Sequence, residues 1–172
     1  VAVEVGEGVQ HAPVALIAGG GLAQLAGALV GADEVVDTPG DHLRHRRTPL
    51  HLATFARQRG AVRALAKAGA DLNLLENDRY DGVTIAAVAD DEETLSVLLS
   101  LGASAKQVTS RYDGTALIAA AHLGHDGVVR QLIAAGAPLD HVNNLHWTAV
   151  IEAIVLGNGG PRHQATLKAL LD

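Results

Sequence analysis

Hydrophobic residues in the middle of the chain recur at helical spacing. The stretch TALIAAAHLG (Thr115–Gly124) is a run of small and aliphatic residues that ends at a glycine, and glycine readily takes the left-handed conformation that closes a helix. The stretch that follows, HDGVVRQLIAAG, has apolar residues at positions i, i+1, i+4 and i+5 of a second helix. Its apolar face comprises Val128, Val129, Leu132 and Ile133. The pattern therefore predicts a short, Ala-rich helix followed by an amphipathic one.

The same pair of helices is repeated along the chain. The related strings VGAD, AGAD, LGAS and AGAP each carry a glycine, and these glycines lie 38, 33 and 34 residues apart, at Gly31, Gly69, Gly102 and Gly136. The related first-helix strings TPLHLA, VTIAAVA, TALIAAA and TAVIEAI begin at Thr48, Val83, Thr115 and Thr148. A two-helix unit of about 33 residues cannot bury its apolar faces alone, so we expect the units to stack on one another.

The string TPLHLA at Thr48–Ala53, followed by GADLN at Gly69–Asn73, resembles the ankyrin-repeat family in its bacterial type. The resemblance implies an all-α ankyrin-repeat solenoid of stacked helix-turn-helix units with β-hairpin fingers. It also implies a binding scaffold without catalytic residues or a cofactor. The expected segments are an N-terminal extension (1–12), a degenerate capping repeat and linker (13–45), three repeats (46–78, 79–111 and 112–144) and an incomplete C-terminal repeat (145–172) with an inserted loop (158–163).

Composition agrees with closely packed helices and excludes several kinds of site. Hydrophobic residues make up 48% of the chain but aromatic residues only 2%, which favours helices packed through small side chains over a sandwich of strands. The formal net charge of −6 argues against nucleic acid as a partner, because phosphates require a basic face. The chain has no cysteine, so disulfides and zinc–thiolate sites are impossible, and either the cytoplasm or the periplasm would suit it.

One uncharged segment is long enough to span a bilayer. It runs from Pro13 to Ala32 and contains the triple glycine Gly19–Gly21. Because three glycines would interrupt a helix in its middle, and because no basic flank accompanies the segment, we expect no membrane insertion. A capping repeat is the preferred interpretation of this segment.

The string RYDG occurs twice, at Arg79–Gly82 and at Arg111–Gly114. Asp-Gly favours a hairpin turn, so we expect both copies at fingertips, with their recurrence reflecting the period of the repeat. A purely structural role is one interpretation. The other is a recognition edge, because Tyr, Trp and Arg anchor protein interfaces. The predicted partner-binding residues on the fingers are Arg79, Tyr80, Arg111, Tyr112, Asn144, Leu145, His146 and Trp147.

The predicted surface continues onto the first helices and leaves some local alternatives open. Equivalent exposed positions of these helices are expected at Phe55, Val88, His122 and Val155, of which Phe55 and His122 are predicted to contact the partner. Trp147 has the alternative of closing the turn against its own helix pair. His146 stands where the family places glycine, so strained backbone is expected there. The loop Asn158–His163 is expected to stand out at the opposite edge as a second possible contact.

Histidine and acidic residues suggest further sites, each with a structural alternative. The resemblance implies that His51 joins neighbouring loops by hydrogen bonds. The run Asp90–Glu93 resembles a cation site, but Asp90 followed by Glu93 is the pattern of a capping pair at a helix start, which we prefer. The nine histidines form no known metal-binding signature, so no metal is predicted.

Binding of another protein is thus the preferred function, with two alternatives left open. One is a small-ligand or metal-binding protein that uses the His-rich surface. The other is a self-associating structural unit, because the sequence stops at Asp172 inside a second helix, before a closing turn. Such an end would expose apolar side chains, so either a further repeat or end-to-end contact is expected.

Overall fold

The computed structural model describes residues 46–172; the predicted extension (1–12) and the whole of the predicted capping repeat and linker (13–45) lie outside the described residues. The described chain consists of four helix pairs and one short hairpin. The pairs are α2 (Pro49–Phe55) with α3 (Arg59–Lys67), α4 (Gly82–Val88) with α5 (Glu92–Ser100), α6 (Ala116–Leu123) with α7 (Asp126–Ala134), and α8 (Ala149–Val155) with α9 (Pro161–Leu171). The hairpin consists of β1 (Val108–Thr109) and β2 (Gly114–Thr115), which pair antiparallel with Val108 opposite Thr115.

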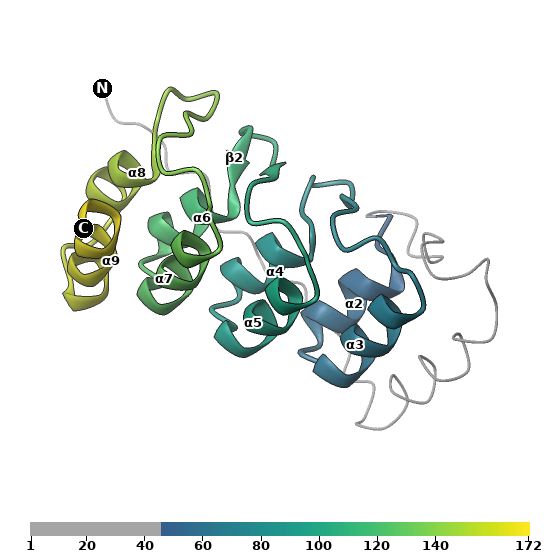
Figure 1. Cartoon of the computed structure of the whole chain (residues 1–172). Coiled ribbons are helices and arrows are strands. Elements are labelled where there is room, and N and C mark those ends of the chain that lie inside the picture. The colour runs from purple at the N-terminus through teal and green to yellow at the C-terminus, as the bar shows by residue number, and fades with distance from the viewer. Residues whose placement is uncertain (1–45) are drawn as a thin grey trace.

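The helix pairs stack in one line, as the sequence predicts. In Figure 1 the first helices α2, α4, α6 and α8 form one layer and the second helices α3, α5, α7 and α9 form the other. Helix α6 packs against both α4 and α8, and α7 packs against both α5 and α9. The loops before α4, α6 and α8 project from the layer of first helices as a row of fingers (Figure 1). The described residues thus confirm the all-α solenoid.

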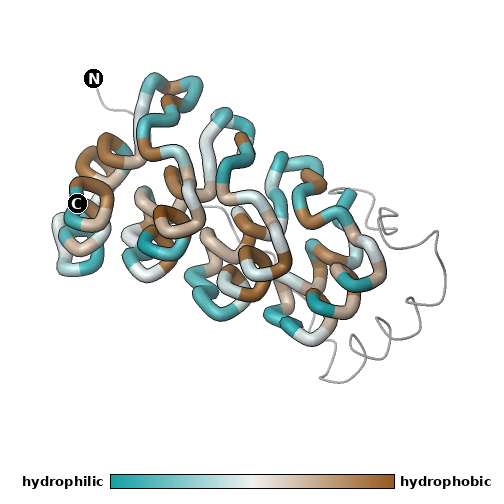
Figure 2. The backbone as a smooth tube through the Cα atoms, viewed as in Figure 1, coloured by the Kyte–Doolittle hydropathy of each residue, from teal (hydrophilic) through white to brown (hydrophobic). Residues whose placement is uncertain are grey.

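Alanine on the first helices sets the close spacing of the stack. One position is Ala in all four of these helices, and it is buried each time, at Ala53, Ala86, Ala120 and Ala153. The second helices contribute bulkier groups, such as Val62 and Leu65 on α3 and Val129 and Leu132 on α7. Burying each large aliphatic side chain stabilises the stack by about 1.5–3 kcal/mol. Figure 2 shows the hydrophobic stretches concentrated in the helices.

Each first helix begins at a capping side chain that accepts a backbone N–H three residues later. The caps are Thr48, Asp81, Thr115 and Thr148. They hold the four repeats in a common register, because a cap fixes where the helix starts. At the first of them, Thr48 and His51 form a complete capping box.

The cap predicted at Asp90 is wrong by one residue. The cap of α5 is Asp91, which accepts the Thr94 N–H over 3.1 Å. Asp90 instead has φ 53°, the left-handed turn position that Gly124 occupies in the next repeat with φ 70°. The two acidic neighbours are equally plausible caps from sequence, and the helix register decides between them.

The two RYDG copies are out of register, so their recurrence does not reflect the period. Asp81 of the first copy is the buried cap of α4, whereas Asp113 of the second copy lies two residues before the cap Thr115. The second copy has Arg111, Tyr112 and Asp113 in the turn of its finger, whereas the first finger turns at residues 77–79, so only Arg79 of the first copy lies in the turn. Helix caps, and not identical letters, set the register of the stack.

The connection before α9 is shorter than the predicted insertion. The caps Thr148 and Gly160 are 12 positions apart, whereas Thr115 and His125 are 10 positions apart. Pro161 starts α9, because proline suits the first turn of a helix. Half of the predicted loop 158–163 is therefore helical.

Candidate partner-binding surface

Neighbouring fingers are joined by hydrogen bonds along their tips. The Ser110 N–H donates to the Arg79 carbonyl over 2.9 Å, and the Asn144 N–H donates to the Tyr112 carbonyl over 2.9 Å. The Asn144 side-chain amide also donates to the Arg111 carbonyl. The sequence-predicted finger residues are thus brought together as one continuous edge.

The two predicted recognition arginines hold the first two fingers together. Arg79 donates to the Asp113 carboxylate and Arg111 donates to the Asp78 carboxylate, each over 2.6 Å, so the pairs run in opposite directions between the fingers. Exposed ion pairs of this kind contribute about 0–1 kcal/mol each. Their main effect is to fix the first two fingers relative to each other, because both arginines already have partners within the chain.

One buried polar side chain supports the first finger from inside, and another supports the third. Glu76 Oε1 accepts the N–H groups of Asp78 and Tyr80, and Asn143 Oδ1 accepts those of Leu145 and Trp147. These supports were missed by sequence reasoning. The available signal is a polar residue four positions before Tyr80 and before Trp147.

The support of the first finger carries an electrostatic cost. Glu76 is only 4% exposed, and burial raises the pKa of its carboxyl above the usual value. Burial likewise raises the pKa of Tyr80, which is half-buried beside it. Arg47 Nε lies 3.8 Å from Glu76 Oε2 and offsets part of the cost.

Tyr112 and Leu145 are large hydrophobic side chains that the fingertips leave in solvent, at 52% and 48% exposed. Asn144 and His146 are also exposed, whereas Trp147 is half-buried and its carbonyl accepts the Asn143 N–H that closes the finger. His146 has φ 63°, which confirms the backbone conformation expected at that position.

The predicted first-helix positions differ along the stack. Phe55 is half-buried, and the Arg47 guanidinium lies 4.3 Å from the centre of its ring. Val88 is also half-buried, but His122 and Val155 are exposed. Each of the latter two is followed by an exposed leucine, Leu123 and Leu156. Among the first helices, the exposed apolar side chains therefore lie at the ends of α6 and α8.

Several histidines bind backbone carbonyls of other repeats or fingers. His51 is buried, and its Nε2 lies 2.9 Å from the Leu74 carbonyl oxygen, which confirms the implied loop-joining role. His125, His141 and His163 make similar contacts with the carbonyls of Ala87, Asp113 and His122. Among residues 46–172, no three His, Asp or Glu side chains are grouped so that they could hold a metal ion.

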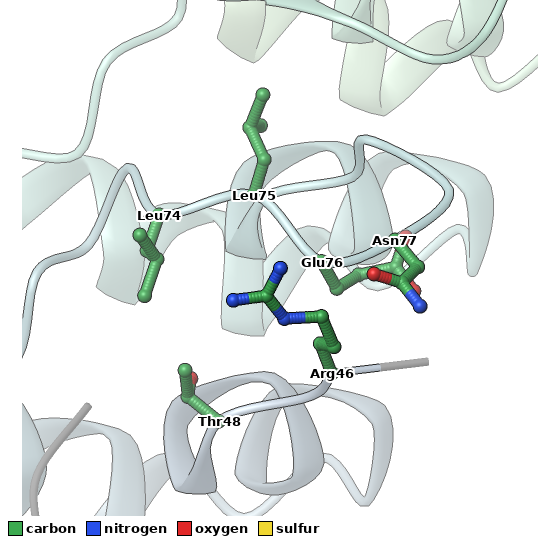
Figure 3. Close-up of a pocket in the computed structure, with 6 residues that line it drawn as sticks. All are labelled: Arg46, Thr48, Leu74, Leu75, Glu76 and Asn77. Atoms are coloured by element: carbon green, nitrogen blue, oxygen red, sulfur yellow. The ribbon is translucent and has the colours of Figure 1, made fainter. Parts of the chain in front are cut away.

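Figure 3 shows a pocket of about 280 Å³ between the first finger and the start of α2. Its lining residues are Arg46, Thr48, Leu74, Leu75, Glu76 and Asn77. The Arg46 side chain extends toward the finger, and Glu76 supplies the one carboxylate of the lining (Figure 3). That carboxylate already supports the fingertip, so this pocket brings together no reactive pair of side chains.

The segment before α9 folds back on the turns of earlier repeats. Arg162 donates to both carboxylate oxygens of Asp90, over 3.0 and 2.8 Å, and lies 3.5 Å from Asp126. The hydrogen bond to Asp90 raises the pKa of Arg162 further. His163 lies 3.0 Å from the His122 carbonyl oxygen. These bonds hold the end of the predicted loop against the stack, so this part does not stand out as expected; a second contact at the loop stays a prediction.

Family comparisons agree with this architecture. A model of three ankyrin repeats matches residues 83–172, and a model of a single ankyrin repeat matches residues 45–77. The chain belongs to the ankyrin-repeat family. Ankyrin repeats are in general scaffolds for protein–protein interaction and not enzymes.

Similar proteins include bacterial and animal ankyrin-repeat proteins. The chain is 33% identical over 130 residues to the putative ankyrin repeat protein YahD of Escherichia coli (strain K12), a region that covers 75% of this chain and 64% of YahD. It is 43% identical over 53 residues to the nuclear factor NF-kappa-B p105 subunit of Gallus gallus, which covers 31% of this chain and 5% of that protein. The chain thus spans less than two thirds of these curated relatives.

A solved ankyrin repeat domain from Acinetobacter baumannii AYE has the same fold. Its TM-score is 0.78 at 40% sequence identity, with coverage of 87% of this chain and 74% of that one. Within residues 46–172, no helix combines the length and apolar character that crossing a bilayer requires.

Proposed function

We propose that this chain is a non-catalytic ankyrin-repeat scaffold that binds another protein through its fingers and its exposed first-helix positions. The observation that carries the proposal is the distribution of exposed apolar side chains. We call Tyr112, Leu145, Leu123, Val155 and Leu156 the recognition edge; all five are at least 40% exposed and lie on two adjacent fingers and two adjacent first helices. Large apolar groups on a rigid surface are typical of protein interfaces.

The internal bonds of the fingers refine which predicted residues should contribute binding energy. Arg79 and Arg111 hold neighbouring fingers and would have to break those pairs to bind a partner's acid. Tyr112 and Leu145 need no such rearrangement, so they should contribute most. The net charge of −6 makes a protein a better partner than nucleic acid.

The test compares serine substitutions of exposed apolar residues on the fingers with a serine substitution of an exposed apolar residue elsewhere. A partner is captured from an extract of cells in which the protein occurs, purified, and titrated calorimetrically against the wild type, the Tyr112→Ser/Leu145→Ser variant and a Leu171→Ser control. Leu171 is 68% exposed at the end of a second helix, away from the fingers. We expect about a tenfold or greater loss of affinity for the double variant and no change for the control. Equal affinities of all three would refute the proposal.

End-to-end self-association is a second candidate, favoured by one residue of α8. Ile154 is 59% exposed, whereas its equivalents Thr54, Ala87 and Ala121 are covered by the following repeat and at most 3% exposed. Sedimentation velocity across a concentration series would detect dimers, and Ile154→Ser should abolish them. A wild-type chain that stays monomeric at high concentration rules this candidate out.

A further inference from the structure

A chain of hydrogen bonds connects the third finger to the concave layer of first helices. Asn143 Oδ1 accepts two N–H groups of the finger, and its Nδ2 donates to Glu152 Oε1 over 3.0 Å. Glu152 Oε2 lies 3.0 Å from His122 Nδ1. Asn143 and Glu152 are buried at 3% and 5% exposure, but His122 is open to solvent on α6. α6 and α8 are neighbours in the layer of first helices (Figure 1).

The buried members of this chain determine where the hydrogens lie. The Asn143 amide cannot be reversed, because its oxygen is needed for two N–H groups. Its nitrogen must therefore donate to Glu152, which as a carboxylate can only accept. The other Glu152 oxygen then accepts from His122, so the proton of a neutral His122 ring belongs on Nδ1. The ring nitrogen left for an outside group is Nε2, with a lone pair.

We infer that Glu152 is a positioning residue that presents His122 Nε2 as a hydrogen-bond acceptor in an apolar rim. We define the rim as Leu123, which follows His122 at the end of α6, together with Val155 and Leu156 at the equivalent positions at the end of α8; all three are exposed and uncharged. In Figure 2 the α8 tube is largely brown, in keeping with this character. The inference rests on the proposed protein-binding function and names the part of the surface that confers specificity.

The occupant of the rim is a segment of another protein with aliphatic side chains and one hydrogen-bond donor, such as a hydroxyl or an amide N–H. The rim carries no charge that would attract a charged segment, and burying a charge against three aliphatic side chains would be unfavourable. If the bound segment lacks a donor facing His122 Nε2, this nitrogen loses its hydrogen bond to water and gains none in return. Segments of that kind should therefore bind more weakly.

Replacement of Glu152 by Gln provides a selective perturbation. Glutamine has one acceptor oxygen, so it cannot accept from both Asn143 and His122. If its oxygen stays with Asn143, its amide nitrogen faces His122 Nδ1, and the ring must move its proton to Nε2. The outward nitrogen then changes from an acceptor to a donor. Glu93→Gln is the matched control, because Glu93 lies on α5, is 75% exposed and pairs with Arg59.

The first measurement is made on the uncomplexed protein. Long-range ¹H–¹⁵N spectra of histidine-labelled protein at about pH 8, above the pKa of imidazole in model peptides, distinguish the two neutral tautomers. We expect His122 to carry its proton on Nδ1 in the wild type and in Glu93→Gln, and on Nε2 in Glu152→Gln. An Nε2-protonated wild-type ring, or no change in Glu152→Gln, overturns the inference.

The second measurement uses peptides selected from a random phage-displayed library on the wild type and depleted on Leu156→Ser. The tightest synthetic peptide should bind Glu152→Gln about tenfold more weakly than the wild type and Glu93→Gln. Equal binding by all three overturns the inference but leaves protein binding itself intact. Failure to obtain any peptide that depends on Leu156 overturns both this inference and the role of the rim in the proposed function.

Discussion

The pairing of Asp90 with Arg162 predicts that Asp90→Gly changes the free energy of unfolding by different amounts in the presence and in the absence of Arg162. Asp90 occupies a left-handed turn position with φ 53°, where glycine would be more comfortable. Arg162, 72 residues later, offsets this strain by hydrogen bonds from its Nη2 to both carboxylate oxygens of Asp90. The change Asp90→Gly removes the strain and the ion pair together, so its net effect depends on whether Arg162 is present.

The magnitudes follow from geometry and exposure. Replacing a non-glycine residue in the left-handed region by glycine should stabilise the fold by about 1 kcal/mol. Both hydrogen bonds come from one guanidinium nitrogen, Nη2, and the pair is half in solvent, with Arg162 53% and Asp90 33% exposed, so it contributes about 0.5–1 kcal/mol. In the wild type, Asp90→Gly should therefore change the free energy of unfolding by no more than about 0.5 kcal/mol. In the Arg162→Ala background it should stabilise by about 1 kcal/mol.

Urea unfolding followed by far-ultraviolet circular dichroism measures all four members of this double-mutant cycle. Lys168→Ala supplies the control background, because Lys168 is exposed on the same helix and pairs with Asp172. Asp90→Gly should have the same small effect there as in the wild type. Equal effects of Asp90→Gly in the Arg162→Ala and wild-type backgrounds would show that the pair carries no energy and would refute the reasoning.

Two further changes test the caps and turns of the repeats. Asp81 is a buried cap whose Oδ2 has no hydrogen-bond partner, and burial raises the pKa of its carboxyl. The change Asp81→Thr keeps a capping side chain, as Thr115 does at the start of α6. It should therefore stabilise the fold by about 1–3 kcal/mol at neutral pH. Because protonation of Asp81 is favoured in the folded state, this advantage should be largest above the raised folded pKa, shrink as the pH falls through that pKa, and be largely lost by about pH 4, the ordinary aspartate value. A difference in the free energy of unfolding between variant and wild type that stays constant from pH 7 to pH 4 would contradict this. Gly124→Ala should cost more than Gly102→Ala in thermal unfolding, because both have positive φ but only at Gly124 would the new Cβ come within 2.7 Å of the His163 ring. Gly102→Ala should cost about 1 kcal/mol from backbone strain alone, and equal losses would show that His163 moves aside freely.

The repeating architecture was predictable because its causes act over a few residues. Helix caps, the left-handed glycine at Gly124 and the apolar face around Val128 are local features that a periodic sequence displays directly. The role of His51 followed from a hexapeptide, TPLHLA, whose capping box closes within four residues. Stacking then follows, because a single helix pair has too little surface to bury.

The arrangement of the fingers and turns was decided only by the tertiary structure. The two RYDG strings look equivalent as letters, yet the cap positions place them two residues out of phase, so Arg79 and Arg111 reach acids on each other's fingers. Glu152 looks like an ordinary exposed helix residue until α6 and α8 pack together around it. By itself the sequence determined which segments fold and in what order they stack, since these depend on local hydrogen bonds and apolar periodicity. Which charged and polar side chains meet across repeats depends on distances between helices that no single segment contains, and those contacts decide which residues remain available to a partner.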